Sequence, residues 1–196
     1  MIFPENISKE EVNQLPLGRY EGPIKVIDDF NQLPLVLSEV QRSPFIGFDT
    51  ETKPAFKKGV YHKVALLQLA TAEQVFLIRL SKMGFPKPLQ ELFNNPALPK
   101  IGISIRDDLI EMQKRARFDP GGIIELNDVA KELGVVREGV RNLTATFLGF
   151  RISKSQQTSN WERDQLTEKQ QYYAATDAWV CHQIYDKLVR QGFISS

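Results

Sequence analysis

The sequence predicts an α/β fold in which a central mixed β-sheet is flanked by helices. Short apolar runs typical of strands come early in the chain, whereas patterns with helical spacing dominate its second half. This order favours a mixed sheet over a regular alternation of strands and helices. The chain has 196 residues, which is enough to bury one substantial core. We expect residues 1–22 to form an extended arm and residues 23–196 to form a single domain.

The predicted elements follow from apolar patterning and from residues that begin or end helices. Strands are predicted at residues 24–26, 45–51, 64–69, 75–78 and 100–105. Helices are predicted from Asp28 or Asp29 to about 40, then at 89–93, from Asp107 or Asp108 to about 117, and at 123–134, 143–148 and 167–189. Residues 151–163 are expected to be a polar loop in which Trp161 anchors against the core.

Helix boundaries carry the clearest local signals. Gly134 and Gly149 are plausible C-caps, since glycine adopts the left-handed conformation at little cost. Thr167 and Gln170 have the spacing of a capping box, so the last helix is the best defined. We expect His182 to lie on the surface of this helix.

Net charge, cysteine content and the apolar runs limit the kind of protein that this sequence can encode. The formal net charge of +1 lacks the large positive excess of a protein that grips nucleic acid over its whole surface, so any such contact must be local. Cys181 is the single cysteine, which favours a reducing compartment and a cytoplasmic, intracellular location. Residues 1–11 lack a signal-peptide pattern, and no apolar run is long enough to span a membrane.

Two acids stand at the end of the predicted strand 45–51. Side chains alternate along a strand, so Asp49 and Glu51 face the same side. Two neighbouring carboxylates repel each other, and a hard divalent cation such as Mg²⁺ or Mn²⁺ resolves that repulsion. The alternative for this pair alone is a solvent-exposed turn after a strand.

Two further acids are candidates for the same site. Asp108 follows a predicted strand, where Asp107 would cap the next helix and leave Asp108 free to face the sheet edge. Tyr173 and Asp177 are four residues apart on the last helix and so share a face. Alone, each has a structural alternative: a helix N-cap for the first, and a buried tyrosine bonded to a helical aspartate for the second.

Taken together, the acids occur in a distinctive order: a strand-end Asp-x-Glu, an Asp at a strand-to-helix junction, and a helical Tyr-x-x-x-Asp. This order resembles the DEDDy group of DnaQ-like 3′–5′ exonucleases, and most closely the ribonuclease D and Werner-syndrome-type exonuclease domains. The resemblance covers roughly residues 23 to 190. It implies a ribonuclease H-like fold and a metal-dependent enzyme that removes nucleotides from the 3′ end of DNA or RNA.

The resemblance also assigns roles to residues. It implies that two Mg²⁺ or Mn²⁺ ions are held by Asp49, Glu51, Asp108 and Asp177, and that Tyr173 helps to orient the attacking water. The expected partner is nucleic acid with a single-stranded or recessed 3′ end. Candidate substrate contacts, with a solvated polar loop as the alternative for the last three, are Thr52, Leu67, Gln68, Lys154, Ser155 and Arg163.

Two other functions remain open at this stage. The chain could be a catalytically silent module that binds nucleic acid or acts as an adaptor on the same fold, because fold does not fix function. It could also be a metal-dependent phosphatase or another small-molecule hydrolase. Trimming of an oligonucleotide from its 3′ end, with and without Mn²⁺, separates these possibilities.

Overall fold

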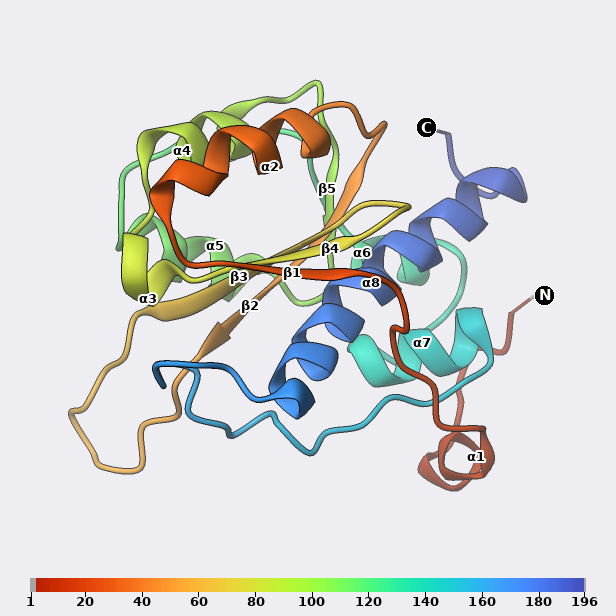
Figure 1. Cartoon of the computed structure of the whole chain (residues 1–196). Coiled ribbons are helices and arrows are strands. Elements are labelled where there is room, and N and C mark those ends of the chain that lie inside the picture. Colours follow the sequence, from red (N-terminus) through yellow and green to blue (C-terminus); the bar gives the residue numbers. More distant parts are fainter. Residues whose placement is uncertain (1–2, 196) are drawn as a thin grey trace.

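The computed structural model describes residues 3–195, which form three layers, with a mixed β-sheet between two groups of helices (Figure 1). The strands are β1 Ile24–Ile27, β2 Ile46–Thr52, β3 Val64–Ala70, β4 Val75–Ile78, β5 Lys100–Gly102 and β6 Ile123–Glu125. The helices are α1 Lys9–Gln14, the 3₁₀ turn Phe30–Gln32, α2 Leu33–Val40, α3 Leu80–Met83, α4 Lys87–Asn94, α5 Arg106–Gln113, α6 Leu126–Glu132, α7 Val140–Leu148 and α8 Glu168–Arg190.

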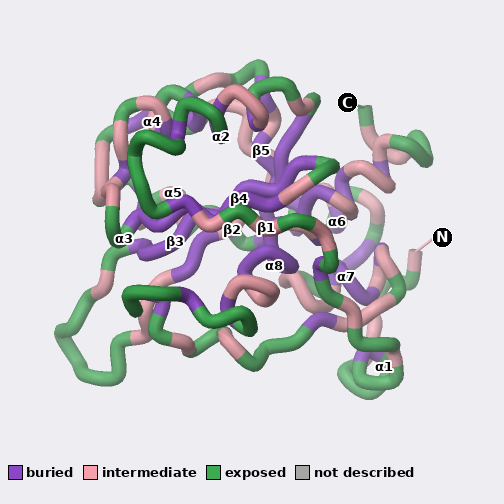
Figure 2. Tube along the Cα trace, in the orientation of Figure 1, coloured by how far each residue is buried: buried purple, intermediate pink, exposed green. Residues whose placement is uncertain are grey.

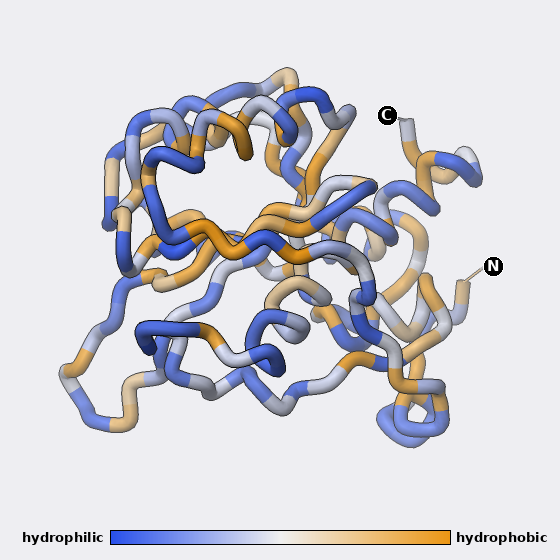
Figure 3. Tube along the Cα trace, viewed as in Figure 1, coloured by the Kyte–Doolittle hydropathy of each residue, from blue (hydrophilic) through white to orange (hydrophobic). Residues whose placement is uncertain are grey.

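The sheet has the strand order β1-β4-β3-β2-β5-β6. β3 is antiparallel to both of its neighbours, β2 and β4, and the other pairings are parallel. β2 therefore lies inside the sheet, with a partner on each side. Figures 2 and 3 show the central strands and the middle of α8 as buried and largely apolar, while the connecting loops are exposed and polar.

Alternating side chains of β2 and β3 divide the core between the two faces of the sheet. Ile46 and Phe48 pack with Leu67 and Leu69 in the core beneath α2, α4 and α5. The opposite face of β3 packs, through residues such as Leu66, against the small alanines of α8. This alternation places every second residue of β2 against α8.

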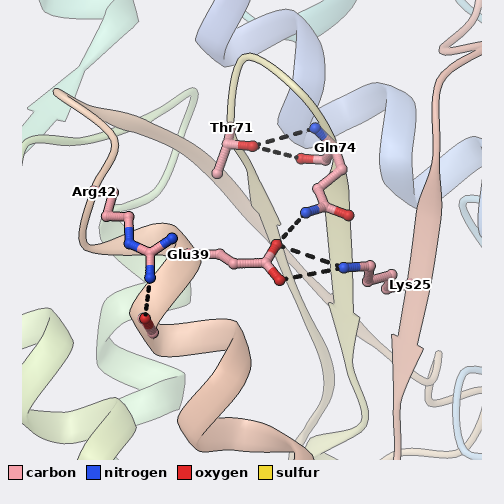
Figure 4. Close-up of polar contacts among 6 residues, drawn as sticks. Lys25, Glu39, Arg42, Thr71 and Gln74 are labelled. Atoms are coloured by element: carbon pink, nitrogen blue, oxygen red, sulfur yellow. Dashed lines mark hydrogen bonds and ion pairs between the residues drawn. The ribbon is translucent and has the colours of Figure 1, made fainter.

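A polar network secures the edge strand β1. The carboxylate of Glu39, on α2, accepts hydrogen bonds from Lys25 of β1, at 3.3 Å, and from Gln74 in the β3–β4 turn (Figure 4). The Thr71 hydroxyl donates to the Gln74 carbonyl at 3.1 Å in the same turn. These bonds join α2, β1 and the turn on the side of the molecule away from the acids.

Several local predictions are confirmed. Thr167 and Gln170 form both hydrogen bonds of a capping box at the start of α8. Gly134 and Gly149 follow α6 and α7 with positive φ angles of 84° and 75°. Trp161 is fully buried, as expected for an anchor of its loop. In residues 3–195, no helix combines the length and apolar character that crossing a bilayer requires.

Other predictions are wrong, and for the predicted helix 123–134 and for His182 the reason is a partner distant in sequence. The arm is not wholly extended, because residues 9–14 form α1, with Ser8 as its N-cap. The first three residues of the predicted helix 123–134 are instead β6, because they pair with the free edge of β5. His182 is not on the surface: it is 3% exposed and packs against Phe45, at 4.7 Å between ring centres.

The junction after β5 also differs from the prediction. The strand ends at Gly102 rather than 105, and Ser104 adopts a left-handed conformation with φ of 61°. α5 begins at Arg106 without a side-chain cap, so Asp107 is not its N-cap. The Glu125 carboxylate accepts hydrogen bonds from the backbone N–H groups of Ser104 and Ile105, both at 2.9 Å. A cap from another part of the chain replaces the local one.

Candidate active site

Close packing of α8 on β2 brings three acids together. Gly47 faces α8, and a Cβ atom at this position would lie 2.2 Å from the Ala178 carbonyl oxygen. Only glycine permits this approach, because any side chain would force the helix away from the sheet. Asp177 on the helix therefore comes close to Asp49 and Glu51, which occupy the same face of β2 as Gly47.

The three carboxylates form one cluster. An oxygen from each of Asp49, Glu51 and Asp177 lies within 4.8 Å of one from each of the others. Burial, followed by the neighbouring charges, raises the pKa values of Asp49 and Glu51. Burial raises the pKa of Asp177 to about 7, although its hydrogen bond with Tyr173 opposes the change. The folded chain thus disfavours the charged forms of these carboxylates, because they are buried close to one another.

Asp108 reaches the same cleft from the start of α5. The Thr50 hydroxyl, which projects from the other face of β2, donates a hydrogen bond to the Asp108 carboxylate. Burial raises the pKa of Asp108, and the bond from Thr50 opposes that effect. Among the neighbouring charges, Asp108 makes the largest contribution to the raised pKa of Asp49, so the two carboxylates are electrostatic neighbours.

Tyr173 completes the group one helical turn before Asp177. Burial, followed by the nearby acids, raises the pKa of its phenol, so the hydroxyl is neutral near pH 7. Its side chain hydrogen-bonds to Asp177, and its ring lies 6.0 Å from that of the buried Trp161. The connection formed by residues 151–167, which contains Trp161, therefore packs against the ring of Tyr173.

The acids and Tyr173 line a cleft of about 620 Å³. Its walls come from α1, from the turn between α6 and α7, and from residues 152–154. A second hollow of about 550 Å³ meets the first at Ile152, Ser153, Tyr173 and Asp177. This cleft brings together all five residues that the sequence predicts for the site: Asp49, Glu51, Asp108, Tyr173 and Asp177.

The predicted substrate contacts divide into three groups of two. Lys154 lines the cleft and Ser155 lines the second hollow. Leu67 and Gln68 are fully buried in β3, where Gln68 pairs with Asp49. Thr52 and Arg163 line neither hollow, although the Arg163 carbonyl accepts a hydrogen bond from Arg79.

Sequence reasoning missed two residues that position the site. Thr50 stands between the two acids of β2, and alternation alone points it toward α5. Glu125 fixes the backbone just before Asp108 through its bonds to residues 104 and 105. No local pattern marks Glu125, because its partners lie about 20 residues away.

The donor set suits a hard divalent cation. All of the candidate ligands are carboxylate oxygens, which Mg²⁺ and Mn²⁺ prefer. Burial, and then repulsion between neighbouring acids, raises the pKa values of Asp49 and Glu51, and a bound cation would offset both costs. The acidic cluster therefore fits metal binding.

A mixed sheet of this order, with buried acids on β2, α5 and α8, defines a ribonuclease H-like nuclease fold, and comparison with known proteins agrees. The chain matches a family model described as 3′–5′ exonuclease over residues 24–192. It is 35% identical over 153 residues to the bifunctional 3′–5′ exonuclease/ATP-dependent helicase WRN of Mus musculus, a match that covers 75% of this chain and 11% of that protein.

Solved structures show the same fold. The Aedes aegypti Nibbler EXO domain superposes with a TM-score of 0.79 at 25% identity, covering 89% of this chain and 92% of that one. Escherichia coli RNase D gives a TM-score of 0.77 at 24% identity, covering 86% of this chain and 45% of that one. The chain belongs to the 3′–5′ exonuclease family, and the predicted family and ribonuclease H-like fold are confirmed.

Proposed function

We propose that this protein is a metal-dependent exonuclease that hydrolyses phosphodiester bonds from the 3′ end of DNA or RNA. The observation that carries the proposal is the convergence of four acids and Tyr173 in one cleft of a chain that belongs to this family. A phosphatase for small molecules would not explain why the chain belongs to a 3′–5′ exonuclease family. A catalytically silent module would not need all four acids.

Each residue has a role in the proposed reaction. Asp49, Glu51 and Asp177 are close enough to hold one ion together, and Asp108, which lines the same cleft, would help to hold a second. When bound, two divalent ions supply Lewis-acid stabilisation of the scissile phosphate and lower the pKa of a water. The neutral Tyr173 hydroxyl orients that water through a hydrogen bond. Thr50 holds Asp108 in place.

The substrate is proposed to be a strand with a single-stranded or recessed 3′ end. Lys154 and Ser155 are the predicted contacts that line the two hollows, so they are the ones retained in this proposal. Leu67 and Gln68 would act through the backbone around Asp49 rather than by direct contact, since both are fully buried.

A degradation assay tests the proposal. Oligonucleotides of single-stranded DNA, recessed duplex DNA and RNA carry a label at the 5′ end, and each is incubated with Mn²⁺ or with EDTA. We expect a ladder that shortens from the 3′ end in Mn²⁺ alone, and the faster substrate identifies the preferred sugar. Asp49→Asn should abolish the ladder, whereas Asp119→Asn, an exposed acid outside the cleft, should not.

Two results contradict the proposal. Shortening from the 5′ end would refute the assigned polarity. Binding of oligonucleotides without any cleavage in Mg²⁺ or Mn²⁺ would favour the silent adaptor module.

A further inference from the structure

The cleft has an acidic floor and a basic rim. Four cations line it together with the acids; we call them the basic rim, and they are Lys9, Arg137, Arg141 and Lys154. Glu138 lines the same part of the cleft, so the rim carries an excess of three positive charges (four cations and one acid). Lys9 comes from α1, the two arginines from the turn before α7 and its first turn, and Lys154 from the connection after α7. Three separate segments thus place positive charge beside one hollow.

These cations have no carboxylate partner within the chain. Across residues 3–195, none of the four appears in an ion pair, that is, within 4.0 Å of a carboxylate oxygen. Lysines elsewhere, such as Lys25, Lys82 and Lys114, are paired with acids. Arg141 donates a hydrogen bond to the Asn13 side chain, and its Nε lacks a partner among the described residues. The charge of the rim is therefore available to an anion.

A chain of hydrogen bonds fixes the rim relative to the acids. The Asn127 side chain donates to the Ser104 hydroxyl at 3.0 Å and accepts from the Gly139 N–H at 2.9 Å. Ser104 lies just before the helix that carries Asp108, and Gly139, with φ of 90°, begins the helix that carries Arg141. The spacing between Asp108 and the arginines is therefore built into the fold.

The N-terminal segment is held against the same elements. The Val136 N–H donates to the Glu5 carbonyl at 2.9 Å, next to Arg137. Farther along the segment, the Gly18 N–H donates to the Arg151 carbonyl at 2.9 Å, and the Tyr20 N–H donates to the Thr176 hydroxyl at 3.0 Å. α1 lies beside α7 in Figure 1. The segment that we expected to be an extended arm lines the cleft through Ile7, Lys9 and Val12.

The second hollow is less suited to phosphate. Its Arg19 is paired with Glu21 at 2.8 Å and lies over the Tyr172 ring at 4.1 Å. This guanidinium already has an acidic and an aromatic partner. Lys169 is the other cation of this hollow and appears in no ion pair among the described residues, so the hollow offers one unpaired cation against the four of the basic rim. Phosphates that leave the acids are therefore more strongly attracted along the basic rim.

We infer that the basic rim binds the phosphates of the strand on the 5′ side of the scissile bond, and that α1 is a substrate-positioning element. This inference rests on the proposed exonuclease function. It assigns Lys9 and Arg137, which nothing in the motif pattern marks, to the recognition of a polymeric substrate. A substrate with one phosphate would reach the acids without touching the rim.

The test compares a long and a short substrate in Mn²⁺. The long one is a 5′-labelled single-stranded 12-mer, and the short one is the p-nitrophenyl ester of thymidine 5′-monophosphate. The variant is Lys9→Gln with Arg137→Gln, since both side chains are exposed and neither makes an ion pair. The control is Lys87→Gln with Lys114→Gln, which removes the same charge outside the cleft.

We expect the rim variant to raise KM for the 12-mer about tenfold, with kcat and turnover of the short ester unchanged. The slope of log(kcat/KM) against log[NaCl] should become shallower by about 1.4, because each phosphate contact to a single strand contributes about 0.7. The control should keep both the wild-type KM and the wild-type slope.

Two outcomes overturn the inference in different ways. If the wild type cleaves the 12-mer and the rim variant has the KM and salt slope of the control, the rim does not bind the strand, although the exonuclease assignment stands. If the wild type cleaves neither substrate in Mn²⁺, the proposed function fails and the inference fails with it.

Discussion

Replacing Asp177 with asparagine should stabilise the metal-free protein, although it should remove activity. Burial raises the pKa of Asp177 from its ordinary value of 3.8 to about 7. Because the folded-state pKa lies above the unfolded value, the stability from this group is complete below the unfolded pKa and is lost as the pH rises through about 7. At pH 8 without metal, the wild-type protein therefore carries a buried charge that opposes folding.

The size of the effect follows from the pKa. One pKa unit corresponds to about 1.4 kcal/mol, so the buried carboxylate costs at most about 4 kcal/mol. The Asp177→Asn substitution keeps the shape of the side chain and removes its charge. We expect the free energy of unfolding to rise by roughly 2–4 kcal/mol in EDTA, which raises Tm by roughly 5–10 °C for a chain of this size.

Manganese should narrow the difference in stability between the two proteins. An ion bound to the folded state at 100 times its Kd stabilises the wild type by about 2.7 kcal/mol, and the variant has lost a ligand for it. The assay is thermal and urea unfolding of both proteins at pH 8, in EDTA and in Mn²⁺. If Asp177→Asn is less stable than the wild type in EDTA, or if both proteins gain equally from Mn²⁺, the reasoning about the acidic cluster is refuted.

Three further changes test other parts of the account. Gly47→Ala should destabilise the fold by about 1–3 kcal/mol in urea unfolding, because its Cβ would lie 2.2 Å from the Ala178 carbonyl oxygen; an unchanged unfolding midpoint would show that α8 does not need this close approach. Burial lowers the pKa of His182 to about 4 from 6.5, so stability is lost as the pH falls from 6.5 toward 4. Between pH 7 and pH 5 the wild type should lose about 2 kcal/mol more than His182→Gln, and equal losses would contradict this. Tyr173→Phe should lower kcat by roughly 10- to 100-fold and keep the stabilisation by Mn²⁺, since the hydroxyl orients water rather than holding metal; an unchanged kcat on the labelled oligonucleotide would remove that role.

Short-range rules predicted the positions of four of the five site residues, whereas Asp108 was assigned from the family resemblance, because the Asp107 cap that its local argument used does not form. Alternation on β2 puts Asp49 and Glu51 on one face, and helical spacing puts Tyr173 beneath Asp177. The capping box at Thr167 correctly located the start of α8. Apolar runs likewise gave the inner strands, whose bounds match the prediction to within one residue except at β5, which ends three residues early.

What the sequence did not reveal depends on contacts between distant segments. The conformation before Asp108 depends on Glu125, and β6 forms because β5 offers it a free edge. His182 is buried because Phe45 and the close approach at Gly47 cover it. The N-terminal segment, whose Ile7, Lys9 and Val12 line the cleft, is held there by hydrogen bonds from residues 5, 13 and 18 to partners more than 100 residues away. Local patterns carry no information about such partners.

The central claim is that acids from β2, α5 and α8 form one metal site. The most direct test is a calorimetric titration of Mn²⁺ into the wild-type protein and into Asp49→Asn, with Asp119→Asn as the control. The account predicts that Mn²⁺ binds the wild type and the control equally, and Asp49→Asn at least about tenfold more weakly, a difference of about 1.4 kcal/mol. Equal affinity of Asp49→Asn and the wild type would contradict the account.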